Sequence, residues 1–237
     1  MRRNLIVAAA AGVVVIVLAG VGGYVYFFSN LRSSPATLRL SATPSPATAS
    51  SGLAGTWKVT SGSLAGYRVQ ELFVGETSKH EAVARTSNVS GGLTVVAVSA
   101  DGSGYQVSGI TLTADMSSLH SVDQVVGRNV TQRDGIVSRQ LDVQQFPSAT
   151  FTATFVSVPG TVTSSQANVS AAGKLTIRGV TKDVVVAATA QVVGDKIEIA
   201  GKTTINMTDY GVTPPRVPFT TVDPAATIDF DVFLIKS

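Results

Sequence analysis

Apolar and polar residues alternate along several short segments of the chain between Trp57 and Leu234. Within residues 110–116, four apolar side chains share one parity, and two threonines and an aspartate fill the positions between them. The same alternation recurs over 151–155 and 228–234. A period of two is typical of strands that bury one face. Short glycine-containing turn signals separate these segments, so the pattern predicts an antiparallel sandwich or barrel.

The segment 119–146 departs from this alternation. It carries most of the charge in the middle of the chain, and Val122, Val125 and Val130 lie at near-helical spacing. We expect one or two short helices here, or a long excursion between strands. Such an excursion either covers the mouth of a barrel or is a plain surface connection, and the sequence leaves both interpretations open.

The N-terminus carries two arginines followed by an uncharged run from Leu5 to Phe28. As a helix this run would rise about 36 Å, enough to cross a hydrocarbon layer of about 30 Å. We therefore predict a single-pass transmembrane anchor over residues 1–28, with its arginines in the cytoplasm. The alternative is a signal peptide that is cleaved, which would leave the protein secreted. In both cases the remainder lies outside the cytoplasm.

Residues 29–54 are rich in Ser, Pro, Ala and Thr and show no apolar period. A stretch of this kind cannot bury enough apolar surface to order itself, so we predict a flexible linker. Residues 55–237 are then long enough to form one domain with its own core. The domain organisation is therefore expected to be anchor, linker and β-domain.

Composition excludes several classes of function. Charged residues make up 14 % of the 237 residues and the net charge is +3, which does not indicate a nucleic-acid partner. The chain has no cysteine, so disulfides, thiolate metal ligands, a catalytic thiol and an acylated lipoprotein cysteine are all excluded.

No combination of residues in the sequence indicates an enzyme. The chain contains neither a Gly-x-Ser-x-Gly elbow nor a phosphate-binding loop. His80 and His120 are far apart, and we interpret them as surface histidines that hold no metal. Asp229 and Asp231 share one parity of a predicted strand, where carboxylates of an outward polar face are expected. We therefore predict that the protein is not an enzyme.

Four motifs carry a resemblance that covers the chain from about residue 55 to residue 236. They are Gly66–Glu71, then Phe146-Pro147 followed by Phe151, then Leu175–Lys182, and finally Asp209–Val212. In this order and spacing the chain resembles the YceI-like family of lipocalin-like polyisoprenoid-binding proteins. Leu175–Lys182 is the motif most similar to the family.

The resemblance implies an eight-stranded antiparallel, lipocalin-like barrel around an elongated apolar tunnel. It also implies a long isoprenoid ligand, such as a quinone tail or a polyprenyl lipid, bound outside the cytoplasm. This lipid would be the only small molecule bound, without a further cofactor or a metal. One departure concerns the head group, because Glu71 stands where many members carry histidine.

Candidate site residues follow from the apolar parity of the predicted strands. The expected tunnel wall consists of Tyr67, Phe73, Leu112, Met116, Phe151, Phe155, Leu175, Ile177, Ile205 and Met207. Glu71, Arg133 and Asp134 are the expected polar residues of the mouth. For the wall residues the alternative is ordinary barrel core, and for Arg133 and Asp134 it is a structural ion pair.

Together these observations predict an extracytoplasmic carrier or reservoir for an isoprenoid or similar amphipathic lipid, tied to the membrane by its N-terminal helix. One alternative is an interaction or stress-response module whose barrel core is filled. A second is an enzyme acting on an isoprenoid, which would need an acid or base inside the cavity. Glu71 is the only residue that the pattern offers for that role.

Overall fold

The computed structural model describes residues 2–28, 32–41, 52–97, 104–125 and 127–237. Eight antiparallel strands close into a barrel in the order β12, β11, β10, β9, β6, β5, β2 and β14, and β14 pairs with β12 to complete the ring. Their bounds are β2 Gly55–Val59, β5 Val89–Ala97, β6 Gly104–Asp115, β9 Ser148–Pro159, β10 Ala167–Ile177, β11 Val180–Val193, β12 Lys196–Asn206 and β14 Thr220–Lys236. The predicted eight-stranded antiparallel barrel is confirmed.

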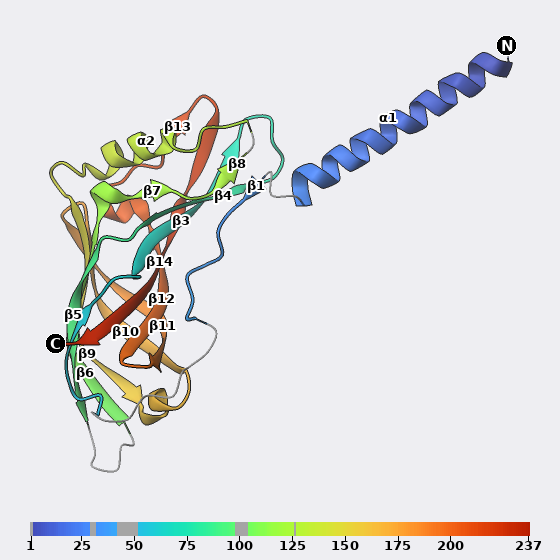
Figure 1. The fold of residues 1–237 in the computed structure, drawn as a ribbon. Helices are drawn as coiled ribbons and strands as arrows, with labels where there is room; N and C mark the ends of the chain where they lie inside the picture. Colours follow the sequence, from blue (N-terminus) through green and yellow to red (C-terminus); the bar gives the residue numbers. More distant parts are fainter. Residues whose placement is uncertain (1, 29–31, 42–51, 98–103, 126) are drawn as a thin grey trace.

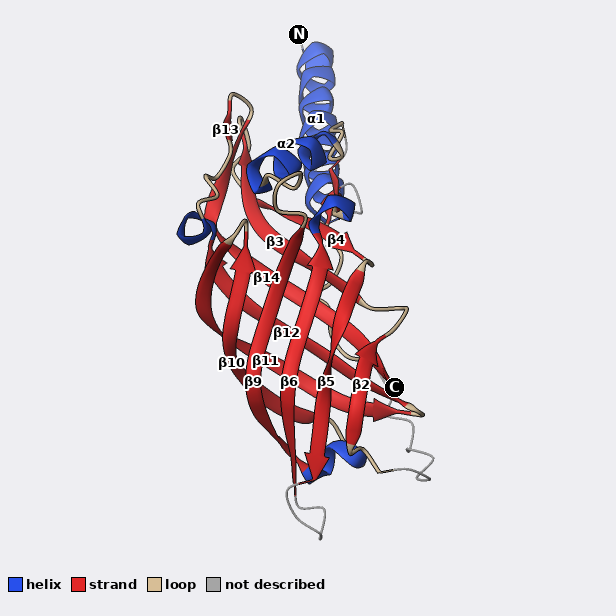
Figure 2. Cartoon of the chain, turned by 90° about the vertical axis from the view of Figure 1, so that its left-hand side faces the viewer, coloured by secondary structure: helices blue, strands red, loops and turns tan. Residues whose placement is uncertain are grey.

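Further strands extend the barrel at one end. They are β3 Leu64–Phe73, β4 His80–Thr86, β7 His120–Ser121 and β13 Arg216–Val217, while β1 Arg32–Ser33 pairs separately with β8 Gln124–Val125. Three short 3₁₀ helices complete the domain: η1 Met116–Ser118, η2 Gly160–Thr163 and η3 Met207–Tyr210. Helix α2, Gln132–Leu141, lies across this same end, which we call the upper end (Figures 1 and 2). The helix expected within 119–146 is therefore confirmed.

Two of the sequence motifs meet at the turn between β10 and β11. Arg178 and Gly179 form this two-residue turn, and both have positive φ angles, +51° and +73°. Such a turn suits the twist of antiparallel strands. A Cβ atom at Gly179 would lie 2.7 Å from Cε1 of Phe146, so the ring of Phe146 packs directly on the glycine.

The alternation of β6 and β9 shifts by one residue near the middle of the barrel. On β6, Val107 and Ile110 are both buried, and Gly109 between them has a φ of +59°. On β9, Ala153 and Val156 are both buried. The shift turns Phe155 outward, with 60 % of its surface exposed, so its assignment to the tunnel wall is wrong.

Part of the predicted flexible linker is ordered against the outer wall of the barrel. Residues 32–41, which we call the strap, begin as β1 and continue alongside the barrel (Figure 1). The backbone N–H of Leu38 donates to Asp229 Oδ2 at 3.1 Å, and that of Ser41 donates to Glu198 Oε1 at 2.7 Å. The linker prediction is therefore wrong for these residues, because charged side chains of the wall bind the strap backbone. Residues 42–51 lie outside the described residues.

The strap also changes the environment of the carboxylates on the outer wall. Asp229 faces outward, as its parity predicts, but neither it nor Glu198 has any exposed surface. Arg68 donates to the carbonyl of Pro35 and, at 3.1 Å, to Asp229. The expected solvated face is thus an interface between the strap and the wall.

Helix α1, Arg2–Phe28, precedes the strap. No helix within the described residues is long and apolar enough to cross a membrane, so the predicted transmembrane anchor is not supported.

Candidate functional site: a segmented apolar tunnel with a polar end

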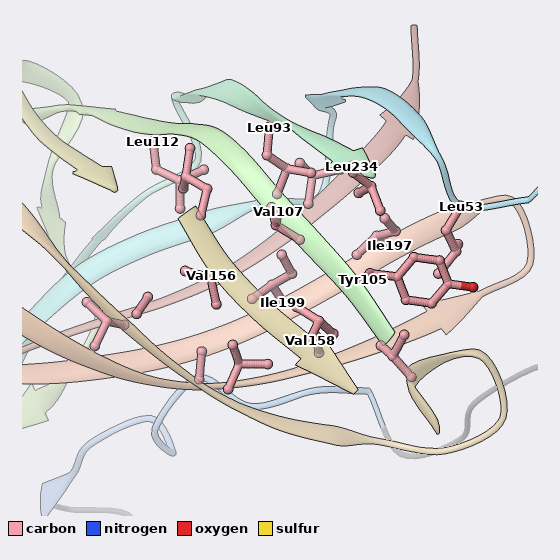
Figure 3. Close-up of a pocket in the computed structure, with 18 of the residues that line it drawn as sticks. Leu53, Leu93, Tyr105, Val107, Leu112, Val156, Val158, Ile197, Ile199 and Leu234 are labelled. Carbon is pink, nitrogen blue, oxygen red and sulfur yellow. The ribbon is translucent and has the colours of Figure 1, made fainter. Parts of the chain in front are cut away.

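The lower half of the barrel encloses an apolar chamber with a cavity volume of about 90 Å³. Seven of the eight ring strands, all but β2, contribute to it, because every strand points alternate side chains inward. Figure 3 shows Leu112 at one end of this lower chamber and Leu53 and Tyr105 toward the other. Its other labelled wall residues are Leu93, Val107, Val156, Val158, Ile197, Ile199 and Leu234.

Two more chambers continue the cavity toward the upper end. The middle chamber has a volume of about 80 Å³ and the upper chamber about 110 Å³. Strand β14 records their order, since Leu234 lines the lower chamber, Phe230 the lower and middle, and Ile228 the middle and upper. Strand β12 gives the same order through Ile199, Thr203 and Ile205. The three chambers therefore lie in series along the barrel, and we call them together the segmented tunnel.

Helix α2 closes over the upper chamber. Arg133, Val137, Gln140 and Leu141 from this helix line it, opposite residues of β3 and β12. Of the two interpretations of residues 119–146, covering the mouth is therefore the one that the structure supports. A plain surface connection would not contribute four side chains to the cavity.

Four ionisable residues form a polar cluster beside the upper chamber: Glu71, His80 and Asp123 are buried, and Arg133 is half-buried. The guanidinium of Arg133 donates to Glu71 Oε1 at 2.7 Å and to Asp123 Oδ1 at 2.7 Å and Oδ2 at 3.2 Å. His80 Nε2 lies 2.7 Å from Asp123 Oδ2. His80 is only 4 % exposed, so its interpretation as a surface histidine is wrong.

Burial and pairing act against each other on the pKa values of this polar cluster. Burial alone would raise the pKa of Asp123, but hydrogen bonds from His80 and Arg133 bring it down to about 2. For Glu71, burial outweighs the attraction of Arg133 and raises the pKa. For Arg133, burial acts to lower the pKa, yet the hydrogen bond to Asp123 and the charge of Glu71 raise it overall. Arg133 is therefore the fixed positive charge of the polar cluster.

The spacing of this cluster also bears on metal binding. Ligand atoms of Glu71, His80 and Asp123 lie within 4.8 Å of one another, a spacing that could hold an ion. Arg133, however, already donates to both carboxylates. A cation would have to compete with this guanidinium, so the geometry is that of an ion-pair network.

Two tyrosine hydroxyls complete the polar end. Tyr67 from β3 and Tyr210 from η3 line the upper chamber. Both hydroxyls are buried and have no hydrogen-bond partner among the described residues. Burial raises the pKa of both phenols, so both stay protonated and can donate a hydrogen bond. A buried hydroxyl without a partner costs free energy, which a bound polar group would recover.

The structure places most of the predicted site residues around the tunnel. Those that line a chamber are Tyr67, Glu71, Leu112, Met116, Phe151, Arg133, Leu175, Ile177, Ile205 and Met207. Phe73 is buried but stacks on His80 with 6.3 Å between ring centroids, outside the chamber linings. Asp134 accepts from the N–H and Oγ of Ser121 at 2.9 and 2.7 Å and so fixes the start of α2.

Three of the site residues that sequence reasoning missed show why. Phe230 belongs to the alternation over 228–234, which was enough to place its side chain inside the barrel. Tyr210 lies in a family-like motif. Nothing in the sequence indicated that Asp123 would meet His80, because their contact joins segments 43 positions apart.

Comparison with known proteins identifies relatives of this fold. A family model described as the YceI-like domain matches residues 60–234. No curated protein matches the sequence. Among solved structures, a polyisoprenoid binding domain from Saccharophagus degradans, implicated in plant cell wall breakdown, superposes with a TM-score of 0.51 at 17 % identity. The match covers 76 % of this chain and 98 % of that one.

Two further solved structures are more distant. BcnA from Burkholderia cenocepacia gives a TM-score of 0.46 at 20 % identity, covering 70 % of this chain and 95 % of that one. The YCEI protein of Campylobacter jejuni gives 0.44 at 16 % identity, covering 65 % and 85 %.

Proposed function

Because the chain belongs to the YceI-like family, we propose that it binds a long-chain isoprenoid or similar amphipathic lipid inside its barrel. The tail would lie along the three chambers and the head group in the upper chamber. The observation that carries this proposal is the tunnel itself, which is apolar along its length. Among the described residues, only its upper chamber is lined by charged side chains, Glu71 and Arg133, together with two tyrosines. The relative from S. degradans is described as polyisoprenoid-binding, which is consistent with such a ligand.

The tail is held by burial alone. Each methylene that leaves water contributes about 0.8 kcal/mol, so several isoprene units offset the cost of ordering the chain. The wall needs no charge for this purpose, and the described side chains around the lower chamber supply none. A ligand with one polar end and a long apolar tail fits this distribution.

The charges of the upper chamber favour an uncharged head group. The positive charge of Arg133 is balanced by Asp123 and Glu71, so the polar cluster carries no surplus positive charge for a diphosphate. The hydroxyls of Tyr67 and Tyr210 can donate to a carbonyl or hydroxyl oxygen. A quinone or a polyprenol therefore suits the site better than a polyprenyl diphosphate.

We propose a carrier or reservoir working outside the cytoplasm rather than an enzyme. Support for the location comes from the sequence, where two arginines precede an uncharged run that suits an export signal. Support for a binding role comes from Glu71, the carboxylate that lines the upper chamber, because it is tied to Arg133.

Calorimetric titration of lipid-free protein tests both parts of the proposal. Hexaprenol and hexaprenyl diphosphate, presented in mixed micelles, share a tail and differ in head charge. We expect the alcohol to bind at least roughly tenfold more tightly, the equivalent of about 1.4 kcal/mol. Tighter binding of the diphosphate would overturn the head-group assignment, and absence of binding by both would overturn lipid binding.

The double variant Tyr67→Phe/Tyr210→Phe removes both hydroxyls with little change in shape. We expect it to weaken hexaprenol binding while leaving the binding of a tail without a head group, such as squalene, unchanged. Equal binding of hexaprenol by variant and wild type would contradict the role of the two phenols.

A further inference from the structure

Two aromatic side chains lie where the lower and middle chambers meet, and we call this place the constriction. Phe151 from β9 and Phe230 from β14 each line both chambers, with Leu112 and Val186 beside them. Strands β9 and β14 stand four strands apart in the eight-strand ring. The two rings therefore project from opposite walls at the same level of the tunnel.

Each ring lies over a glycine of the neighbouring strand. A Cβ at Gly173 would lie 2.6 Å from Cζ of Phe151, and a Cβ at Gly201 would lie 2.7 Å from Cζ of Phe230. Glycine weakens a strand interior, so it is found there mainly where another group approaches closely. Any larger residue at either position would push the ring into the tunnel. The two glycines thus let the rings lie back against the wall.

We propose that this constriction determines the length of the isoprenoid chain that the barrel accepts. The inference rests on the proposed lipid binding and adds a specificity element to it. A ligand whose head group lies in the upper chamber reaches the lower chamber only by passing between Phe151 and Phe230. The binding of a chain that ends above the two rings does not depend on the space between them, whereas the binding of a longer chain does.

Strand geometry gives the length at which this dependence begins. Val222 in the upper chamber and Phe230 at the constriction are eight residues apart on β14. At about 3.3 Å per residue and a tilt of about 40°, they are separated by about 20 Å along the barrel axis. Leu234, in the lower chamber, lies four residues further, or about another 10 Å. Farnesol is short enough to stay above the constriction, and hexaprenol extends beyond it.

The variant Gly201→Ala tests this proposal. Its new methyl group would lie 2.7 Å from Cζ of Phe230, the far end of a side chain that can swing into the tunnel, and 2.9 Å from Cβ of Ala188. At Gly173 the methyl would instead lie 2.4 Å from the backbone carbonyl oxygen of Thr152, which cannot move as easily. We expect hexaprenol to bind roughly tenfold more weakly and farnesol to be nearly unaffected, because losing the burial of a few methylenes has an effect of that size. Lys202→Ala, at the next and outward-facing position of β12, is the matched control.

Two further variants keep the test decisive. Phe230→Trp narrows the constriction without altering a glycine, and we expect it to weaken the binding of hexaprenol but not that of farnesol. This variant keeps the test available if Gly201→Ala fails to fold. In Gly201→Ala/Phe230→Leu the smaller side chain makes room for the methyl, so hexaprenol binding should return. Circular dichroism confirms that each variant is folded.

The outcomes separate the two proposals. Selective loss of hexaprenol in the narrowed variants supports the length determinant. If the narrowed variants bind both alcohols equally more weakly, or bind both as the wild type does, the length determinant is overturned. The lipid-binding proposal is then still supported, because the wild type binds both alcohols. Failure of the wild type to bind either alcohol overturns lipid binding and, with it, the inference that rests on it.

Discussion

Gly179 and Phe146 show how single residues join segments that are distant in the sequence. The glycine has a φ of +73°, and the ring of Phe146 occupies the place of its missing side chain. We expect Gly179→Ala to lower the free energy of unfolding by about 2–3 kcal/mol, from backbone strain and from displacement of the ring. Urea denaturation measures this loss.

Gly194 is the matched control for that substitution. It has a φ of +62°, but nothing lies within 4 Å of the position that a Cβ would take. Gly194→Ala should therefore lower the free energy of unfolding only by the contribution of backbone strain, about 1–2 kcal/mol. If the two variants lose the same free energy, the packing of Phe146 on Gly179 contributes nothing.

Arg133 is the residue on which the polar cluster depends. Its removal would leave the carboxylates of Glu71 and Asp123 buried without their positive partner. We expect Arg133→Met to destabilise the protein by about 3–5 kcal/mol, the usual effect of breaking a buried pair. Thermal unfolding tests this, with the exposed Arg139→Met on the same helix as control, and similar unfolding temperatures for both variants would contradict it.

The alternation of apolar and polar residues correctly predicted tunnel residues on strands whose side chains alternate inward and outward without interruption. Leu175 and Ile177 on β10 are inside for this reason. Phe155 is outside because the parity of β9 shifts near Gly109, a backbone event without a sequence signal of its own. The environment of His80 depends on a contact with Asp123 from a distant segment, so no local pattern could reveal it.

Among the elements, the strap is one that sequence reasoning misjudged. Its residues have no apolar period, and its order comes from Asp229 and Glu198 of the barrel wall, which bind its backbone. We expect the amides of Leu38 and Ser41 to exchange with solvent at least roughly a hundredfold more slowly than in the urea-unfolded protein. Exchange of both amides at the unfolded rate would show that the strap is a free linker.

Asp231, on the wall beside Glu198, gives the barrel a dependence on pH. Burial, followed by the negative charge of Glu198, raises the pKa of its carboxyl from 3.8 to about 7. Between these values the folded protein holds a proton that the unfolded chain has lost, so stability falls as pH rises through this window. Below the window, the stabilising effect of the proton is fully present.

Asp231→Asn should make this dependence shallower, because asparagine is neutral throughout. The free energy of unfolding still falls somewhat with pH in this variant, since the pKa of Glu71 is also raised. Chemical denaturation in steps across the window measures the slope, with the exposed Asp195→Asn as control. An unchanged slope in Asp231→Asn would contradict the assignment.

At the scale of the whole molecule, the barrel follows from alternation and turns, and its closure with eight strands follows from the family resemblance. What the sequence could not supply is the division of the tunnel. The lower and middle chambers are separated by Phe151 and Phe230, whose rings pack against glycines on other strands. Their polar end likewise forms only when α2 brings Arg133 over β3.

The account as a whole claims that this tunnel is built to hold a lipid. Native mass spectrometry of the full chain, purified without delipidation, tests this claim most directly. We expect a protein peak with an added mass that fragments to an uncharged isoprenoid, and its loss when solvent-extracted protein is measured. A single peak at the mass of the bare chain, unchanged after incubation with hexaprenol, would contradict the claim.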